Sequence, residues 1–190
     1  KYKSLGCSLL HVDSASDIYQ DIEKSFNNTA KPIQNFSLAG FRSLPKVTEV
    51  FEMRRNGEVE RFESGKYSNV GNAKLLWHGT DIAAGAAIVS TGLRIMPGSG
   101  GRCGKGIYFA NEACKSGYYV RKAPDGSCLM FLAEVSLGKQ HHLNSDGQGG
   151  WNLKKAPSGY HSTHALGKSG PCETGDVGMS FGGQVLVKQV

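Results

Sequence analysis

Several features that define large protein classes are missing from this sequence. Its five cysteines are odd in number and scattered without a Cys-x-x-Cys pair, which argues against a disulfide framework and for a reducing compartment. The longest apolar runs, such as residues 129–135, are too short to cross a bilayer, so we expect no membrane partner. Residue 1 is lysine and no signal segment follows it, so we expect a piece of a longer protein that is not secreted.

Runs of basic residues are also missing, although the formal net charge is +6 over 190 residues. A basic balance attracts phosphate groups, whether they belong to a nucleotide or to a nucleic acid. Because the charge is spread along the chain, a solvated basic surface explains it as well as a nucleic-acid-binding domain does. The length and the 39% hydrophobic content predict one globular domain.

Glycine, in contrast, is abundant. Many of the 26 glycines fall between residues 92 and 106 and again between residues 147 and 183. Glycine tolerates positive φ angles and allows the backbone to approach a ligand closely. These two stretches therefore predict loops around a binding site.

The first regular element that the pattern predicts is an amphipathic helix after an extended segment at residues 1–12. Asp13 or Ser14 is a suitable N-cap, and Ile18, Ile22 and Phe26 recur at helical spacing on one face. The Asn-Asn pair that follows, and the proline after it, should end this helix.

The other predicted elements are mostly short strands. Alternating residues at 47–54, followed by Asn56-Gly57, predict a β-hairpin, and a polar connector should follow at 61–72. Together the elements predict an α+β domain with few short helices. The remaining ones are strands at 74–78, 106–110, 127–137 and 184–188, an alanine-rich helix at 81–90 capped by Thr80 or Asp81 and ended by Gly92, and a short helix from Asn111 to Tyr119, with residues 138–183 mainly loop.

The glycine loop at residues 98–106 does not match the common phosphate-binding patterns. Ser99 stands where a Walker loop has its first glycine, and Gly106 stands where that loop has Ser or Thr. Cys103 interrupts the Rossmann spacing, and a strand rather than a helix follows. The pattern alone fits a nucleotide loop and a flexible turn.

His78 is a candidate for a ligand contact. It ends a short buried strand beside a Gly-Thr pair with open backbone groups, although a structural role fits a strand-end histidine as well. No metal site is predicted, because the cysteines lack zinc spacing and the pairs His141-His142 and His161/His164 lie in loop-like stretches. No Gly-x-Ser-x-Gly nucleophile motif occurs either.

A group of aromatic residues surrounds Ser116 in the sequence: Tyr108, Phe109, Tyr118 and Tyr119. Such residues are typical of core packing around a strand and a helix. They also fit a stacking clamp for a planar ring, with Ser116 as its polar anchor. The pattern leaves both interpretations open.

A set of short segments occurs in a specific order along the chain. The segments are Leu75-Leu76-Trp77-His78-Gly79-Thr80, Gly92-Leu93-Arg94-Ile95, Gly104-Lys105-Gly106-Ile107-Tyr108-Phe109-Ala110, Lys115-Ser116 with Tyr119, Phe131-Leu132-Ala133-Glu134-Val135-Ser136-Leu137-Gly138 and Ala165-Leu166-Gly167-Lys168. In combination they closely resemble the catalytic domain of the poly(ADP-ribose) polymerases, from about residue 5 to residue 187. The short Gly-Leu-Arg-Ile-Met-Pro loop is most similar to that of the third DNA-repair member of the family.

The resemblance implies a role for each matching residue. His78 should hold the adenosine ribose of NAD, and the backbone of Gly79 and the hydroxyl of Ser116 should bind the nicotinamide carboxamide. Tyr119 and Tyr108 should stack on the two faces of the nicotinamide ring. The implied catalytic residues are His78, Tyr108 and Lys115, which lies beside the reacting ribose, and the implied cofactor-binding residues are His78, Gly79, Thr80, Arg94 near the adenine, Tyr108, Phe109, Ser116 and Tyr119, with residues 95–104 as a lid.

The resemblance also implies the fold and the reaction. Split mixed and antiparallel sheets should enclose NAD, which is the substrate: the bond from nicotinamide to ribose breaks through a cation-like sugar, and rigid orientation lowers the barrier. Acceptors should be proteins, with DNA ends as a second class, in the nuclear DNA-damage response; otherwise the location should be cytoplasmic. DNA should bind through other domains, and nicotinamide-like inhibitors should bind this one.

One signature of the family, a glutamate on a strand near the C-terminus, is not found. Residues 182–187 resemble the segment before that strand, Glu134 matches a different, structural position, and Glu173 lies in a loop. A sheet without its last strands exposes its edges. We therefore expect residues 1–190 to be one catalytic domain whose last strands, like the preceding helical regulatory subdomain, lie outside this chain. The alternative is a module that binds NAD or ADP-ribose without turnover.

Overall fold

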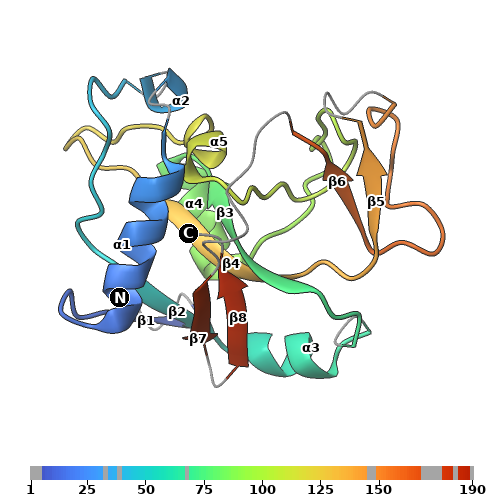
Figure 1. Ribbon diagram of the computed structural model, residues 1–190, viewed down its shortest axis with the longest axis horizontal. Helices are drawn as coiled ribbons and strands as arrows, with labels where there is room; N and C mark the ends of the chain where they lie inside the picture. The colour runs from blue at the N-terminus through green and yellow to red at the C-terminus, as the bar shows by residue number, and fades with distance from the viewer. Residues whose placement is uncertain are drawn as a thin grey trace.

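Three small sheets form the frame of the fold in a computed structural model that describes residues 6–31, 34–37, 40–66, 69–144, 149–167, 177–181 and 184–188 (Figure 1). The strands are β1 (Cys7–His11), β2 (Phe51–Arg55), β3 (Ala73–Gly79), β4 (Met130–Ser136), β5 (Gln140–Leu143), β6 (Ser162–Ala165), β7 (Val177–Phe181) and β8 (Gln184–Lys188). The helices are α1 (Asp17–Thr29), α2 (Gln34–Ser37), α3 (Glu58–Ser64), α4 (Ile82–Thr91) and α5 (Ala113–Gly117). These split sheets and short helices confirm the predicted α+β class.

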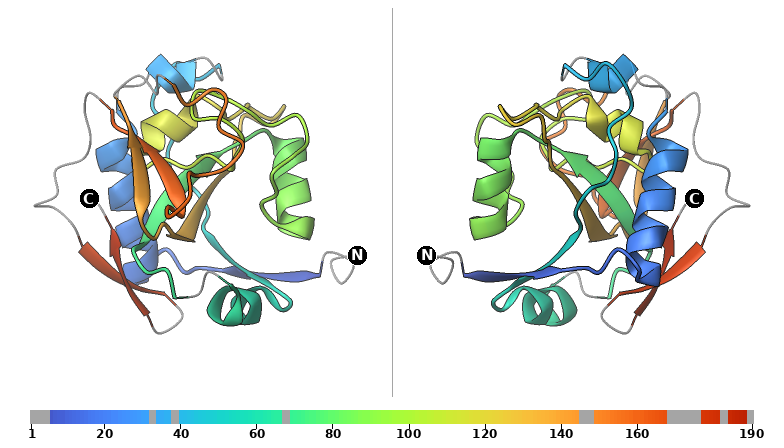
Figure 2. Two further views of the ribbon diagram at one scale, coloured as in Figure 1. Left: turned by 90° about the vertical axis from the view of Figure 1, so that its right-hand side faces the viewer. Right: turned by 90° about the vertical axis from the view of Figure 1, so that its left-hand side faces the viewer.

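The strand β3 is the centre of the largest sheet, whose order is β4-β3-β8-β7. It pairs antiparallel with β4, from Ala73 opposite Ser136 to Gly79 opposite Met130, and parallel with β8. Figure 2 shows α1 and α4 on opposite sides of the β3–β4 pair. Because β3 is covered on both faces, its sequence is a continuous apolar run and does not alternate between apolar and polar residues.

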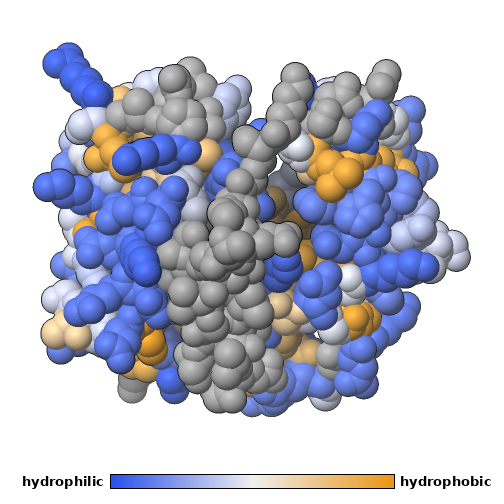
Figure 3. All heavy atoms as spheres, in the orientation of Figure 1, coloured by the Kyte–Doolittle hydropathy of each residue, from blue (hydrophilic) through white to orange (hydrophobic). Residues whose placement is uncertain are grey.

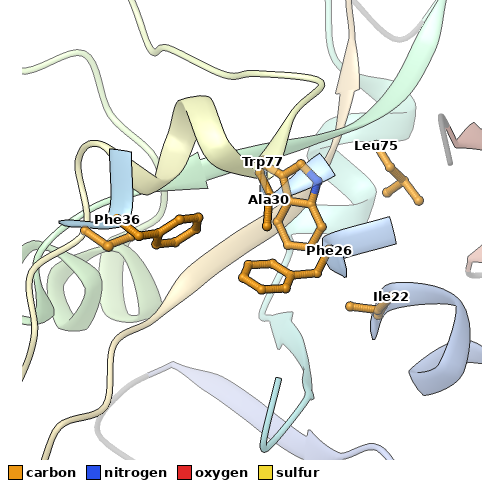
Figure 4. Close-up of a cluster of buried hydrophobic side chains, with 8 residues drawn as sticks. Ile22, Phe26, Ala30, Phe36, Leu75 and Trp77 are labelled. Carbon is orange, nitrogen blue, oxygen red and sulfur yellow. The ribbon is translucent and has the colours of Figure 1, made fainter. Parts of the chain in front are cut away.

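The core lies where α1 packs against β3. The ring of Phe26 meets the ring of Trp77 edge-on at 5.9 Å between centroids, and it meets Phe36 at 5.8 Å (Figure 4). Ile22 and Leu75 complete this face of the cluster. Burial of each such side chain stabilises the fold by about 1.5–3 kcal/mol, so the cluster holds β3 and its functional end firmly against α1.

The start of α1 differs from the prediction. Ser16, and neither Asp13 nor Ser14, is the N-cap, and its hydroxyl accepts the N–H of Tyr19 at 3.3 Å. Asp13 instead closes the turn before the helix by accepting the N–H of Ala15 at 2.9 Å. Local turn chemistry therefore delays the helix, because the Asp13 side chain is already used.

The end and the face of α1 also differ in part. The helix continues through Asn27 and Asn28 to Thr29, because tertiary contacts of Thr29 outweigh the low helix propensity of asparagine. Phe26 lies in the core as predicted, whereas Ile18 is 41% exposed and does not share its burial.

The predicted hairpin at Asn56-Gly57 is wrong. The strand β2 pairs with β1, and Gly57, at φ 67°, leads into the helix α3 instead of a return strand. Arg55 forms an ion pair with Glu58 in the first turn of α3, which favours the helix. Part of the predicted polar connector is therefore helical.

The glycine-rich half of the chain holds three further differences. Residues 106–109 form no strand, and only Ala110 bridges to Trp77, through hydrogen bonds of 2.7 and 2.9 Å. The helix α5 follows Glu112 rather than Asn111 and ends at Gly117, short of Tyr119. The stretch predicted as mainly loop also contains the parallel pair of β5 and β6, and β7.

Other predictions are confirmed. The helix α4 is capped by Asp81, whose carboxylate accepts the N–H of Ala84 at 2.7 Å, and it ends at Gly92. The strands β3, β4 and β8 lie where the sequence predicts them. The predictions for Lys168, Glu173 and residues 182–183 lie outside the described residues.

The surface in the view of Figure 3 is mostly hydrophilic, with small separate hydrophobic patches. Within the part of the chain that the structure describes, no helix has the length and apolar character needed to span a membrane.

Candidate functional site

The last residues of β3 carry the centre of the candidate site. His78 forms a hydrogen bond between its Nδ1 and the backbone carbonyl of Tyr108 at 2.8 Å. A carbonyl oxygen only accepts, so Nδ1 donates, and in the neutral ring Nε2 is left as a hydrogen-bond acceptor. Phe109 and Phe131 flank the imidazole at 5.7 and 6.4 Å between ring centroids. The ring is therefore held in one orientation with a defined acceptor nitrogen.

Gly79 is the residue at which two backbone segments approach most closely. A Cβ atom on this residue would lie 1.9 Å from the carbonyl oxygen of Ser116 and 3.3 Å from a methyl group of Val120. Only glycine therefore permits β3 to end directly against α5. The need for glycine here is a need for space, because its φ angle is not in the left-handed region.

Ser116 brings a hydroxyl to the same place from α5. The residue is 4% exposed, and its hydroxyl donates to the carbonyl of Trp77 at 2.9 Å. The same carbonyl also accepts the N–H of Ala110 at 2.9 Å. If the Ser116 hydroxyl turned to another partner, the Trp77 carbonyl would keep a hydrogen bond, so the hydroxyl can change partners without leaving a buried acceptor unpaired.

Two residues that the sequence did not single out hold α5 in position. The hydroxyl of Thr29 accepts the N–H of Ala113 at 3.1 Å and donates to the carbonyl of Ser25 at 2.8 Å. The ring of Phe36 packs on Gly117, where a Cβ atom would lie 2.5 Å from the ring. Neither residue belongs to a motif, and the partners are distant in sequence, so only the tertiary structure reveals them.

The tyrosines near α5 are exposed, which excludes a purely structural core role for them. Tyr108 is 36% exposed, Tyr118 45% and Tyr119 47%. The rings of Tyr118 and Tyr119 meet edge-on at 5.1 Å between centroids. Burial raises the pKa of the Tyr108 hydroxyl. Rings that face solvent are available to a planar ligand.

Hydrogen bonds and close packing hold the second half of the glycine loop in place. The hydroxyl of Tyr108 accepts the N–H of Cys103 at 3.2 Å and donates to the carbonyl of Gly104. Gly104 has φ 83°, and a Cβ atom there would lie 2.2 Å from the carbonyl of Leu153. Lys105 donates its N–H to that carbonyl at 2.7 Å. The loop is therefore a constrained turn and not a phosphate cradle of the Walker type.

The basic residues of the predicted site, Lys115 and Arg94, are both exposed. Lys115 is exposed on α5, and burial raises the pKa of the Cys103 thiol while the charges of Arg102 and Lys115 lower it. Arg94 is exposed on the segment after α4, and Thr80 follows β3 and is half-buried.

Glu134 lies apart from His78, at the position of β4 that faces Leu75. Burial, and secondarily the charge of Glu63, raise the pKa of its carboxyl, and its Oε1 has no hydrogen-bond partner among the described residues. It lines a cavity of about 430 Å³ together with Phe62, Glu63, Asn69, Gly71, Ala73 and Ser136. Glu134 does not take part in the site at the end of β3.

Neither the second cavity nor a metal cluster adds to this site. The second cavity, of about 270 Å³, is lined by Val70, Ser136, Lys155, Ala156, Tyr160 and His161. In the described ranges, no group of three or more His, Cys, Asp or Glu residues is arranged to hold a metal ion. The residues gathered around His78 therefore remain the candidate site.

Comparisons with known proteins match this chain over nearly its whole length. The family model of the poly(ADP-ribose) polymerase catalytic domain matches residues 16–183. Protein mono-ADP-ribosyltransferase PARP3 of Mus musculus is 40% identical over 189 residues, which are 98% of this chain and 33% of that protein, and PARP3 of Homo sapiens gives the same values. Poly [ADP-ribose] polymerase 1 of Arabidopsis thaliana is 36% identical over 202 residues, which cover 99% of this chain and 19% of that protein. The chain thus spans a third or less of the length of these relatives.

Proposed function

The chain belongs to the poly(ADP-ribose) polymerase catalytic-domain family, and from this membership we propose that it binds NAD and transfers the ADP-ribose group to proteins. In this reaction the bond between the ribose C1′ and the nicotinamide nitrogen breaks, and nicotinamide leaves with the electron pair. The nucleophile of the acceptor forms a new bond to C1′ and releases its proton. The observation that carries the proposal is that β3 and α5 bring His78, Gly79 and Ser116 together.

His78 is proposed to hold the adenosine ribose. Its Nδ1 is used by the carbonyl of Tyr108, so Nε2 is an acceptor of fixed direction, suited to a ribose hydroxyl. The neutral ring meets this need, since a doubly protonated ring has no acceptor.

Gly79 and Ser116 are proposed to bind the nicotinamide carboxamide. This amide group carries one acceptor and two donors, and it needs a donor–acceptor pair opposite it. Gly79 offers only backbone groups, directly beside the Ser116 backbone, and the Ser116 hydroxyl is able to leave the Trp77 carbonyl for a ligand. A leaving group held in this way is fixed as charge redistributes in the transition state.

The aromatic and basic residues complete the proposed site. Tyr108 and Tyr119 are proposed to stack on the nicotinamide ring, because both residues are exposed. Lys115 is proposed to lie beside the reacting ribose, and Arg94 near the adenine. Thr80 and Phe109 line the same region, adjacent to His78.

The wider role is proposed from the relatives. The names of the relatives include a protein mono-ADP-ribosyltransferase and poly [ADP-ribose] polymerases, which supports proteins as acceptors here. We place the activity in the nucleus and in the response to DNA damage, with DNA bound by other parts of a longer protein. Nicotinamide-like inhibitors are proposed to compete at Gly79 and Ser116. Residues 1–190 are proposed to belong to one catalytic domain.

Release of nicotinamide tests the proposal together with NAD binding. The protein is incubated with NAD and an acceptor protein, and free nicotinamide is measured; a parallel melting curve with and without NAD reports binding, since a ligand of the native state raises Tm. We expect a Tm increase that His78→Ala and Ser116→Ala each reduce. Stabilisation without nicotinamide would favour a binding module, and no effect of NAD on Tm would contradict the proposed site.

A further inference from the structure

The hydroxyl of Tyr108 makes contacts that a stacking role does not require. It accepts the N–H of Cys103 at 3.2 Å and donates to the carbonyl of Gly104. Both partners are backbone groups of the glycine loop. A phenol oxygen with both its donor and acceptor functions used in this way is a fixed anchor for a loop.

The loop at this point is a closed turn. Gly104 donates its N–H to the carbonyl of Gly101 at 2.9 Å, so the Tyr108 hydroxyl binds groups at the end of that turn. A Cβ atom on Gly101 would lie 3.0 Å from the Tyr108 hydroxyl, tighter than ordinary van der Waals contact. The absence of a side chain at Gly101 thus leaves room for the anchor.

The backbone of Tyr108 contacts His78. The backbone carbonyl of Tyr108 accepts the hydrogen of the His78 Nδ1 at 2.8 Å. One residue therefore joins the glycine loop, through its side chain, to the histidine at the end of β3, through its backbone. Neither contact involves the face of the ring.

We propose that the Tyr108 hydroxyl is a positioning group that holds the glycine loop in register with His78 for the nucleotide half of NAD. This inference rests on the proposed function and assigns the hydroxyl a part in it that is separate from ring stacking. The loop and His78 both serve the adenosine and phosphate end of the ligand, whereas the ring serves the nicotinamide end. Loss of the hydroxyl frees the loop and leaves the ring in place.

The substitution Tyr108→Phe separates the two roles. Dissociation constants of the protein are measured by calorimetry for NAD, for ADP-ribose and for nicotinamide alone. Loss of neutral hydrogen bonds predicts roughly three- to tenfold weaker binding of NAD and of ADP-ribose. Binding of nicotinamide should be unchanged, because the phenyl ring still stacks. Tyr160→Phe is the matched control, because it removes a tyrosine hydroxyl beside β6 that is away from the loop.

A second variant disturbs the same contact from the opposite side. Gly101→Ala places a methyl group against the Tyr108 hydroxyl and should also weaken NAD and ADP-ribose while sparing nicotinamide. If both variants disrupt the same contact between the Tyr108 hydroxyl and the loop, the loss of NAD affinity in the double variant is smaller than the product of the two separate losses. Equal losses for all three ligands, or unchanged affinities in Tyr108→Phe, would overturn the inference. Failure of the unsubstituted protein to bind NAD would instead overturn the proposed function.

Discussion

At the scale of single residues, the end of β3 depends on the missing side chain of Gly79. In Gly79→Ala the new Cβ atom would overlap the carbonyl oxygen of Ser116, so β3 and α5 must separate. We expect a loss of about 1–3 kcal/mol of unfolding free energy, measured in urea, together with weaker NAD binding. Gly98→Ala is the matched control, because a Cβ atom there meets nothing within 4 Å. Equal stability of the two variants would contradict this close approach.

A second residue-scale prediction concerns the thiol of Cys103. Burial raises its pKa despite the opposing charges of Arg102 and Lys115. Because the thiolate is the reactive form, a raised pKa lowers the thiolate fraction at a given pH. We expect iodoacetamide to modify Cys103 more slowly at pH 8 than it modifies the same residue in urea, and the difference should shrink as the pH rises above 9. Mass spectrometry of the peptide measures both rates, and equal rates at pH 8 would refute the prediction.

At the scale of elements, α5 depends on the hydroxyl of Thr29. In Thr29→Val the buried N–H of Ala113 loses its acceptor, which costs about 1–3 kcal/mol of unfolding free energy. Because α5 carries Ser116, NAD binding should weaken as well. Thr29→Ser keeps the hydroxyl and should retain most of the stability. Chemical denaturation and titration with NAD measure these effects, and an equal loss in the two variants would contradict the prediction, because keeping the hydroxyl would then preserve nothing.

The helices and strands differ in how far the sequence predicts them. The end of α4 at Gly92 and its cap at one of Thr80 and Asp81 are local signals that the sequence predicts, and the structure selects Asp81. The hairpin at Asn56-Gly57 failed because β1, far away in sequence, is the partner of β2. Thr29 and Phe36 support α5 across long sequence separations, so no local pattern could have identified them. The motif residues His78 and Ser116 were identified because the family motif contains them, and the structure brings them together through Gly79 and Trp77.

At the scale of the whole molecule, β3 connects the four-stranded sheet with the core and the candidate site. This strand joins β4 and β8 in one sheet, contributes Leu75 and Trp77 to the core cluster and ends in the candidate site. Stability and binding are therefore linked, because a change that loosens the packing of Phe26 on Trp77 also releases the residues beside His78. The apolar run of β3 predicted a buried strand, but its pairing with the distant β8 could not be read from any local pattern.

The acid sensitivity of the molecule should depend on His164. Burial lowers the pKa of His164 below its usual 6.5, with smaller contributions from His142, which faces it across β5 and β6, and from Lys74. Between the unfolded pKa and the lower folded one, the unfolded chain binds a proton that the folded protein does not. Titration of His164 thus leaves the free energy of unfolding unchanged above about pH 6.5 and lowers it as the pH falls below that value.

Urea unfolding at pH 7.5 and 5.5 measures this loss. In His164→Gln the difference in unfolding free energy between the two pH values should be smaller than in the unsubstituted protein, because the titrating group is gone. His142→Gln removes a lesser cause of the shift and leaves the burial of His164 in place, so it should give an intermediate difference. If His164→Gln lost as much stability on acidification as the unsubstituted protein, acid sensitivity would have to arise from other groups, and burial at the β5–β6 pair would not govern it.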